Sequence, residues 1–176
     1  KTNEITRGII RVVTTGDAQV SVHVEEKVAS DQAKSKPTTL TEEEFYEAIE
    51  TPEIQEAYRH IIDHSIEMGA IPRWRSAGVS IQLPNPTGKG FFTLCILTIH
   101  GDAYVGWLGD QLERTDRNRK IATQLVQELC ELLPGVSPSP HYDDSLTPNI
   151  QGMDLVTRLD EFCDVLHRTI DRITES

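Results

Sequence analysis

Hydrophobic and polar residues alternate in two short segments near the start of the chain. These segments, residues 9–14 and 18–24, flank the dipeptide Gly16-Asp17. Alternation with period two around a glycine-containing turn is typical of a β-hairpin with one buried face. Residues 29–37 then contain no large hydrophobic side chain, which is typical of a solvated linker. We therefore predict a hairpin over residues 1–28, a linker over 29–39 and a domain over 40–176.

The next two segments have the signals of helices. Thr41-Glu42-Glu43-Glu44 matches a capping box, so a helix is expected to begin at Glu42. Thr51-Pro52 ends this helix and starts a second one, because threonine is a good N-cap and proline fits the first helical turn. The second helix is expected to end at Gly69, since glycine accepts the left-handed backbone that is common after a helix.

Three segments after Gly69 have the pattern of strands. Residues 78–83 alternate between hydrophobic and polar, and residues 103–108 follow a Gly101-Asp102 turn. Residues 91–99 are almost continuously hydrophobic, which predicts a strand buried on both faces in the middle of the sheet.

Helical periodicity returns from Asp116 and ends at Pro134-Gly135. A proline-rich loop over residues 137–148 follows, in which Asp143 and Asp144 beside His141 are interpreted as a polar turn. The last segment places hydrophobic residues from Leu155 to Ile173 on one helical face. The order ββ, αα, βββ, α, α predicts an α+β fold: an antiparallel sheet with helices packed on it, preceded by an N-terminal β-hairpin.

The length, charge and hydrophobic runs of the chain limit its domain organisation, its location and the kinds of molecule that it is expected to bind. A chain of 176 residues fits one domain with an appendage. Its 17 Lys and Arg against 28 Asp and Glu give a net charge of −11, which disfavours nucleic acid and anionic membranes as partners. No run of 18 hydrophobic residues and no signal-peptide pattern is present, so we expect a cytoplasmic protein without a membrane partner. The missing initiator Met predicts a piece of a longer protein.

The three cysteines, Cys95, Cys130 and Cys163, are odd in number and widely spaced, which argues against a disulfide framework or a zinc knuckle. We expect buried thiols.

Basic residues in the acidic domain gather in two short segments. The candidate contacts for a nucleic acid or another anion are Arg73, Trp74, Arg75, Arg114, Arg117, Arg119 and Lys120. If the fold brings them together, guanidinium groups and a stacking indole meet in one place. The preferred interpretation is a helix start balanced by Glu113 and Asp116, with Trp74 closing the core.

One helical face offers a candidate metal site. His60 and His64 are separated by one turn, and Glu67 lies on the same side, so two imidazoles and a carboxylate could reach a zinc ion. Nothing in the pattern fixes a further ligand, and the preferred interpretation is the solvent-exposed face of the second helix. The sequence implies no cofactor.

Two further motifs resemble enzyme signatures. Asp17 with Glu25-Glu26-Lys27 resembles the metal-binding signature of restriction-endonuclease-like nucleases. Along one uninterrupted strand, however, Asp17 and Glu25 stand roughly 26 Å apart, too far to share a metal ion. Pro86-Thr87-Gly88-Lys89-Gly90 lacks the first glycine and the final Ser or Thr of a phosphate-binding loop, so we expect a hairpin connection there.

The succession of motifs from Leu40 onward resembles one known domain. The motifs are Leu40-Thr41-Glu42-Glu43-Glu44-Phe45, a helix ending at Gly69, a Trp-containing segment, three strands, Leu133-Pro134-Gly135-Val136, Pro148-Asn149-Ile150 and a final amphipathic helix. This order resembles an uncharacterised C-terminal α+β domain of large prokaryotic ATP-binding proteins associated with genome defence. The resemblance implies a context, carries no catalytic residues and makes the hairpin the tail of a preceding ATPase region.

The informative positions are caps, turns and hydrophobic stripes. They favour a non-catalytic accessory or interaction domain whose partner is another protein or the rest of its own parent chain. The alternatives are a nucleic-acid-contacting module of a defence complex and a metal-dependent nuclease-like enzyme.

Overall fold

In the computed structural model, which describes residues 39–176, the first helix begins where the capping box predicts. Helix α1 (Glu42–Glu47) is preceded by Thr41, whose hydroxyl accepts a hydrogen bond from the Glu44 N–H at 3.2 Å. The Glu44 carboxylate in turn accepts one from the Thr41 N–H at 2.7 Å. The predicted hairpin over residues 1–28 lies outside the described residues, as does all of the linker except Thr39.

Helix α2 (Pro52–Glu67) starts on proline and ends as predicted, because Gly69 has a φ of +86°. Thr51 stands at its N-cap but makes no side-chain capping hydrogen bond.

The sheet is antiparallel throughout, and its five strands are ordered β1-β2-β3-β4-β7. The strands are β1 (Ile71–Trp74), β2 (Gly78–Pro84), β3 (Phe91–Thr98), β4 (Asp102–Tyr104) and β7 (Ile150–Gln151). The central position of β3 agrees with its continuously hydrophobic sequence. The α+β fold with an antiparallel sheet is thereby confirmed for residues 39–176.

A β-bulge explains why two consecutive side chains of β3 are buried in the same core. Ile81 pairs with Cys95, whereas the next residue, Gln82, pairs with Thr93. Leu94 is the extra residue, and Leu94 and Cys95 are both almost completely buried. The bulge keeps the alternation of β2 in register with β3 on both sides of this point.

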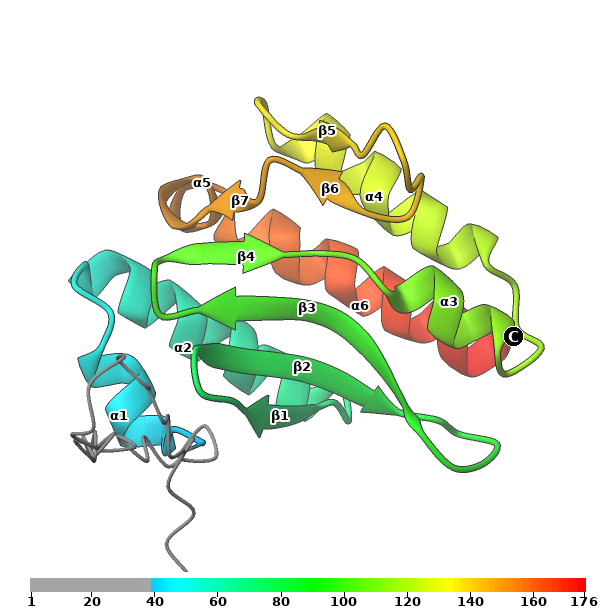
Figure 1. Ribbon diagram of the computed structural model, residues 1–176, viewed down its shortest axis with the longest axis horizontal. Coiled ribbons are helices and arrows are strands. Elements are labelled where there is room, and N and C mark those ends of the chain that lie inside the picture. Colours follow the sequence, from blue (N-terminus) through cyan, green and yellow to red (C-terminus); the bar gives the residue numbers. More distant parts are fainter. Residues whose placement is uncertain (1–38) are drawn as a thin grey trace, which may run out of the picture. The chain divides into compact units, whose positions relative to one another are not determined.

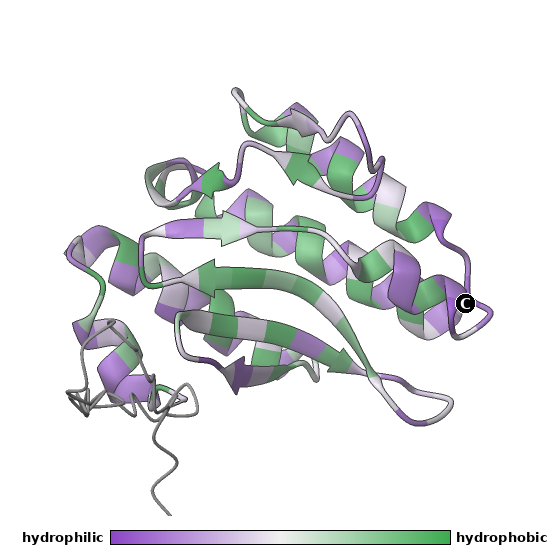
Figure 2. Ribbon diagram, in the orientation of Figure 1, coloured by the Kyte–Doolittle hydropathy of each residue, from purple (hydrophilic) through white to green (hydrophobic). Residues whose placement is uncertain are grey.

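The three long helices lie on one side of the sheet. Figure 1 shows α2 and α6 (Leu159–Glu175) behind the strands, with α4 (Lys120–Leu132) beside α6. The colouring of Figure 2 shows hydrophobic residues alternating along the strands and recurring along the helices. Tyr58, Phe162 and Leu166 are completely buried between these layers. No helix within residues 39–176 is long and apolar enough to cross a membrane.

Several element boundaries differ from the prediction. Residues 71–74 form an edge strand that was not predicted, because a four-residue strand containing Pro72 has almost no sequence signature. The strand predicted over 103–108 ends at Tyr104, and α3 (Leu108–Glu113) follows directly after Trp107, whose φ of +70° turns the chain.

The last two predicted helices also differ. Helix α4 begins at Lys120 and not at Asp116, because Asp116 has a left-handed φ of +57° that no α-helix accommodates. The final helix is broken at Arg158 into α5 (Gly152–Thr157) and α6. The proline-rich loop contains a small two-stranded sheet of β5 (Ser137–Pro138) and β6 (Leu146–Thr147).

Candidate functional site

The side of the sheet opposite the long helices is the candidate site, and we call it the open face. In β2, Val79, Ile81 and Leu83 belong to the hydrophobic core, so by alternation Ser80 and Gln82 point the other way, where both are nevertheless buried at 4% and 8% exposure. The register pairs Arg73 with Ser80 and Ile71 with Gln82. Because directly paired residues share a face, Ile71 and Arg73 lie on the open face. Ser80 also pairs with Ile96, and Ile96 pairs with Tyr104, so these two residues lie on the open face as well.

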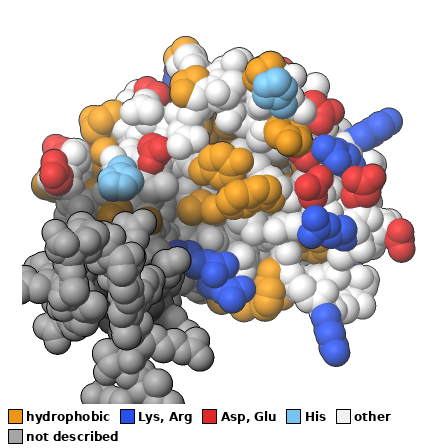
Figure 3. Space-filling view, in the orientation of Figure 1, with side chains coloured by type: hydrophobic (Ala, Val, Ile, Leu, Met, Phe, Trp, Pro, Cys, Tyr) orange, Lys and Arg blue, Asp and Glu red, His pale blue; other side chains and the backbone are white. Residues whose placement is uncertain are grey.

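Large hydrophobic side chains remain exposed on this side of the molecule. Ile71, Phe91, Trp107 and Tyr142 are between 46% and 64% exposed. In the view onto the open face, Figure 3 shows hydrophobic side chains gathered near the centre, with Lys and Arg beside them and Asp and Glu toward the edges. The open face is therefore a mixed hydrophobic and charged surface.

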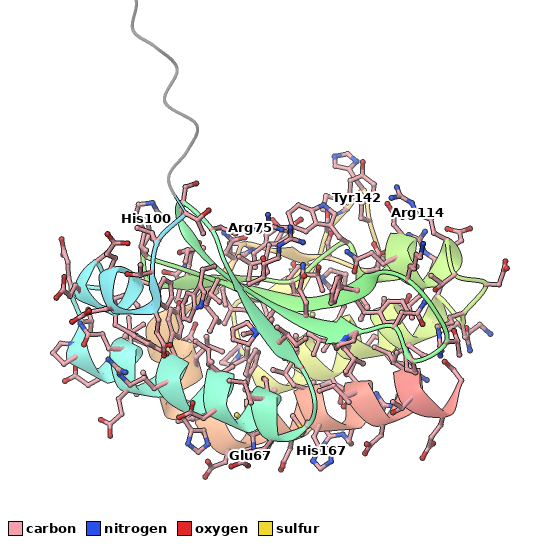
Figure 4. The ribbon with its side chains drawn as sticks, turned by 90° about the horizontal axis from the view of Figure 1, so that it is seen from below. Glu67, Arg75, His100, Arg114, Tyr142 and His167 are labelled. Carbon is pink, nitrogen blue, oxygen red and sulfur yellow. The ribbon has the colours of Figure 1, made fainter. Side chains whose placement is uncertain are left out.

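The structure brings together only part of the predicted basic cluster. Arg73 is exposed on β1 and Arg75 is exposed directly after it, and Figure 4 shows Arg75 and Arg114 on the same side of the sheet. Trp74 points into the core, where its ring centroid lies 5.4 Å from that of Phe45. This agrees with the preferred interpretation, in which Trp74 closes the core, and removes the indole from the predicted stacking site.

Arg117 is used inside the fold. Its guanidinium donates hydrogen bonds to the carbonyl oxygens of Ile173 and Ser176. It thereby ties the turn before α4 to the end of α6. Lys120, by contrast, is exposed at the first position of α4.

Arg119 is surrounded by carboxylates. Its guanidinium lies 3.1 Å from Glu113 and Asp144, 3.4 Å from Asp110 and 3.7 Å from Asp143. Asp144 is the main cause of the raised pKa of Arg119. Of the two carboxylates expected to balance this helix start, Glu113 pairs with Arg119, whereas Asp116 forms no ion pair within residues 39–176. The other partners of Arg119 are Asp110, Asp143 and Asp144.

Asp143 and Asp144 lie in a turn, as interpreted from the sequence, but Asp144 is only 5% exposed. Its carboxylate lies against the first turn of α3, where a Cβ atom on Gly109 would come within 1.9 Å of an Oδ atom. Glycine at this position is what admits the carboxylate. The pairing with Arg119 then supplies the countercharge that a buried carboxylate requires.

A pocket opens beside this group of charges, and we call it the aromatic pocket. Its volume is about 210 Å³, and its lining residues are Tyr104, Trp107, Asp110, Tyr142, Asp144 and Ser145. The ring centroids of Tyr104 and Trp107 are 5.0 Å apart and the rings are tilted by 48°. Three aromatic rings and two carboxylates therefore meet around one hollow.

Local backbone geometry builds this pocket. The left-handed φ of Trp107 leaves the indole 53% exposed beside Tyr104 instead of buried under α3. The loop carrying Tyr142 is held by the Leu146 N–H, which donates to the Val105 carbonyl at 3.2 Å. The Ser145 hydroxyl donates to the Tyr142 carbonyl at 3.2 Å and fixes the tip of the loop.

The candidate metal residues lie on the helical side, away from the open face. The rings of His60 and His64 are stacked with centroids 6.2 Å apart, and His60 Nε2 lies 3.8 Å from an Asp160 carboxylate oxygen. Figure 4 places Glu67 and His167 at this outer side of the helices. Within residues 39–176, no three His, Cys, Asp or Glu side chains are grouped to hold a metal ion. His60 and Glu67 are exposed on this face, as the preferred interpretation expects, whereas His64 is half-buried.

The cysteines are free, as expected, and Cys95 and Cys163 are buried. Burial raises the pKa of each of these two thiols to about 12, so both are protonated at neutral pH. Cys130 is half-buried, and burial raises its pKa as well.

Sequence reasoning missed the aromatic pocket because its residues come from two segments that are more than thirty positions apart. The available signals were Gly106-Trp107 within the strand predicted over 103–108, and two aspartates in a loop rich in proline. Neither signal joins the two segments without the fold.

Comparison with protein-family models, with curated proteins and with solved structures gives no match for this chain.

Proposed function

We propose that this chain contains a non-catalytic interaction domain, residues 40–176, that binds a partner polypeptide across its open face. The observation that carries the proposal is the exposure of Ile71, Phe91, Trp107 and Tyr142 on the side opposite the long helices. Clustered exposed hydrophobic side chains with charged neighbours are typical of protein interaction surfaces. Trp, Tyr and Arg are also the residue types that contribute most to binding at such surfaces.

The adjacent sheet edge supports binding across the face and not along the edge. Strand β1 is terminal in the sheet, but Pro72 has no N–H to offer to an added strand. The N–H of Leu40 donates to the Arg75 carbonyl at 3.2 Å and occupies another position next to this strand. An extended peptide therefore finds few free backbone partners at β1.

Selection from a random peptide library on the full 176-residue chain tests the proposal, since selected peptides concentrate where a surface binds best. The enriched peptides are expected to lose at least about tenfold in affinity for the Ile71→Ala and Tyr142→Ala variants. The matched controls are Ile66→Ala and Met153→Ala, which remove hydrophobic side chains that are 47% and 50% exposed and belong to α2 and α5. Equal losses in test and control variants, or losses in the controls alone, would overturn the proposal.

A second candidate, contact with nucleic acid, is favoured by one observation. Arg73 on β1 and Arg75 directly after it are exposed, Arg114 is exposed on the same side of the sheet as Arg75, and Trp107 supplies an exposed ring. The net charge of −11 and the carboxylates around Arg119 oppose a polyanion. We place this candidate second for that reason.

The genome-defence context implied by the resemblance stays a prediction. The nuclease-like alternative rests on Asp17, Glu25 and Lys27, which lie outside the described residues, and it stays a prediction as well.

A further inference from the structure

The aromatic pocket has the walls of a site for an organic cation. Tyr104, Trp107 and Tyr142 present three aromatic rings to one hollow of about 210 Å³. An aromatic face carries partial negative charge, so a cation within about 6 Å of the ring is attracted to it. Trp107 and Tyr142 are more than half exposed, so a group from another molecule can reach both rings.

The floor of the pocket is acidic. Asp110 and Asp144 line it, and both belong to the group of four carboxylates that faces the single guanidinium of Arg119. Four negative charges against one positive charge leave an excess of three. The side chain of Asp110 is 56% exposed, and its Oδ1 atom lies 3.4 Å from the Arg119 guanidinium. The other carboxylate oxygen therefore keeps the capacity to accept a further hydrogen bond.

These features distinguish between kinds of ligand. An anion would meet both the carboxylates and the negative faces of the rings, and a neutral group would lack the charge–charge and cation–π attraction that a cation gains there. A guanidinium binds best when both oxygens of one carboxylate are available to it, whereas Asp144 is already paired with Arg119 at 3.1 Å. An ammonium group is a compact charge that needs only single oxygen acceptors and ring faces.

We infer that the aromatic pocket holds the ammonium group of a lysine side chain presented by the partner polypeptide. The inference rests on the proposed function, because it names the chemistry by which that partner is recognised. The occupant is also complementary to a chain whose net charge is −11, since a lysine-rich segment is attracted to it from a distance.

NMR titration of the ¹⁵N-labelled 176-residue chain tests the inference. The chain has two tryptophans, so two indole N–H signals are expected, and Trp107→Phe identifies the exposed one. The probes are the peptide acetyl-Gly-Lys-Gly-amide, the same peptide with neutral Nε-acetyl-lysine, and choline as a free ammonium ion. The lysine peptide is expected to shift the Trp107 signal and to bind at least about tenfold more tightly than the acetyl-lysine peptide.

Two variants and two controls locate the binding. Asp110→Asn and Tyr142→Ala each alter an exposed pocket residue, and each is expected to weaken lysine binding at least about threefold. Asp164→Asn and Met153→Ala change an exposed carboxylate and an exposed hydrophobic side chain on α6 and α5, and they are expected to leave binding unchanged. Thermal melts of all four variants show whether the fold is retained.

Three results would overturn the inference. The first is equal binding of the lysine and acetyl-lysine peptides. The second is that the lysine peptide does not saturate the chain. The third is saturation by choline but not by the lysine peptide, a result that would assign the pocket to a small free cation. If library peptides still depend on Ile71 while the lysine peptide fails, the proposed function stands and the lysine site falls. If neither kind of peptide depends on the open face, both fall.

Discussion

The pairing of Arg119 with Asp144 gives a prediction that separates the structural role of Arg119 from its candidate role in anion binding. Asp144 is 5% exposed, so Arg119→Gln leaves a buried carboxylate without its countercharge. Breaking a fully buried ion pair costs about 3–5 kcal/mol. The Arg119 side chain is 38% exposed and partly screened by solvent, so we expect a smaller loss of about 1–2 kcal/mol in the free energy of unfolding.

Urea unfolding followed by far-UV circular dichroism measures this loss in a double-mutant cycle. The cycle comprises Arg119→Gln, Asp144→Asn and the double variant, and the expected coupling energy is about 1 kcal/mol, because Asn at position 144 no longer needs a countercharge. Lys120→Gln is the control: it removes the neighbouring exposed cation and should change stability by less than about 0.5 kcal/mol. Additive costs within about 0.3 kcal/mol would refute the pairing and return Arg119 to the candidate anion-binding residues.

Three further predictions concern the first helix, the core and nucleic acid. Thr41→Ala should lower the free energy of unfolding by about 1 kcal/mol, because its hydroxyl accepts the Glu44 N–H; an unchanged melting curve would mean that α1 does not depend on this cap. Phe162→Ala should cost about 3–5 kcal/mol in urea unfolding, since Phe162 is completely buried on α6; a cost near zero would place this helix face outside the core. Fluorescent single-stranded DNA should not bind the chain below about 10 µM at physiological salt. Tight, salt-sensitive binding that is lost when Arg73, Arg75 and Arg114 are all replaced by Gln would instead favour the second candidate function.

Local signals made the start of α1 and both ends of α2 predictable. The capping box at Thr41 and Gly69 after α2 act within one helical turn, so their outcome depends little on the rest of the chain. The position of β3 was also predictable, because a nearly continuous hydrophobic run is typical of a strand in the middle of a sheet.

The boundaries of β1, β4, α3 and α4 depended on contacts that no local sequence pattern contains. Trp107 and Asp116 adopt left-handed backbone angles although neither is glycine, and the sequence gives no warning of either turn. Strand β1 exists because it pairs with β2 in register, and not because of its own composition. Propensity alone could not have located these elements.

The candidate site was predicted only in part for the same reason. Arg73 and Arg75, two of the candidate anion contacts, are exposed, but Arg117 and Arg119 bond to partners at residues 173 and 144. Basic residues that are adjacent in sequence therefore differ in availability, and only the fold decides which are free. The aromatic pocket likewise forms only because the fold brings residues 104–110 next to residues 142–145.

The most direct test of the central claim is to map where a selected peptide binds on the folded chain. Amide chemical shifts of the ¹⁵N-labelled 176-residue chain are recorded during titration with the most enriched library peptide. We predict that the largest shifts fall in residues 71–75, 78–84 and 104–107, which form or border the open face. Largest shifts in α2, α4 and α6, with the open face unaffected, would contradict the proposal that this domain binds its partner through the sheet.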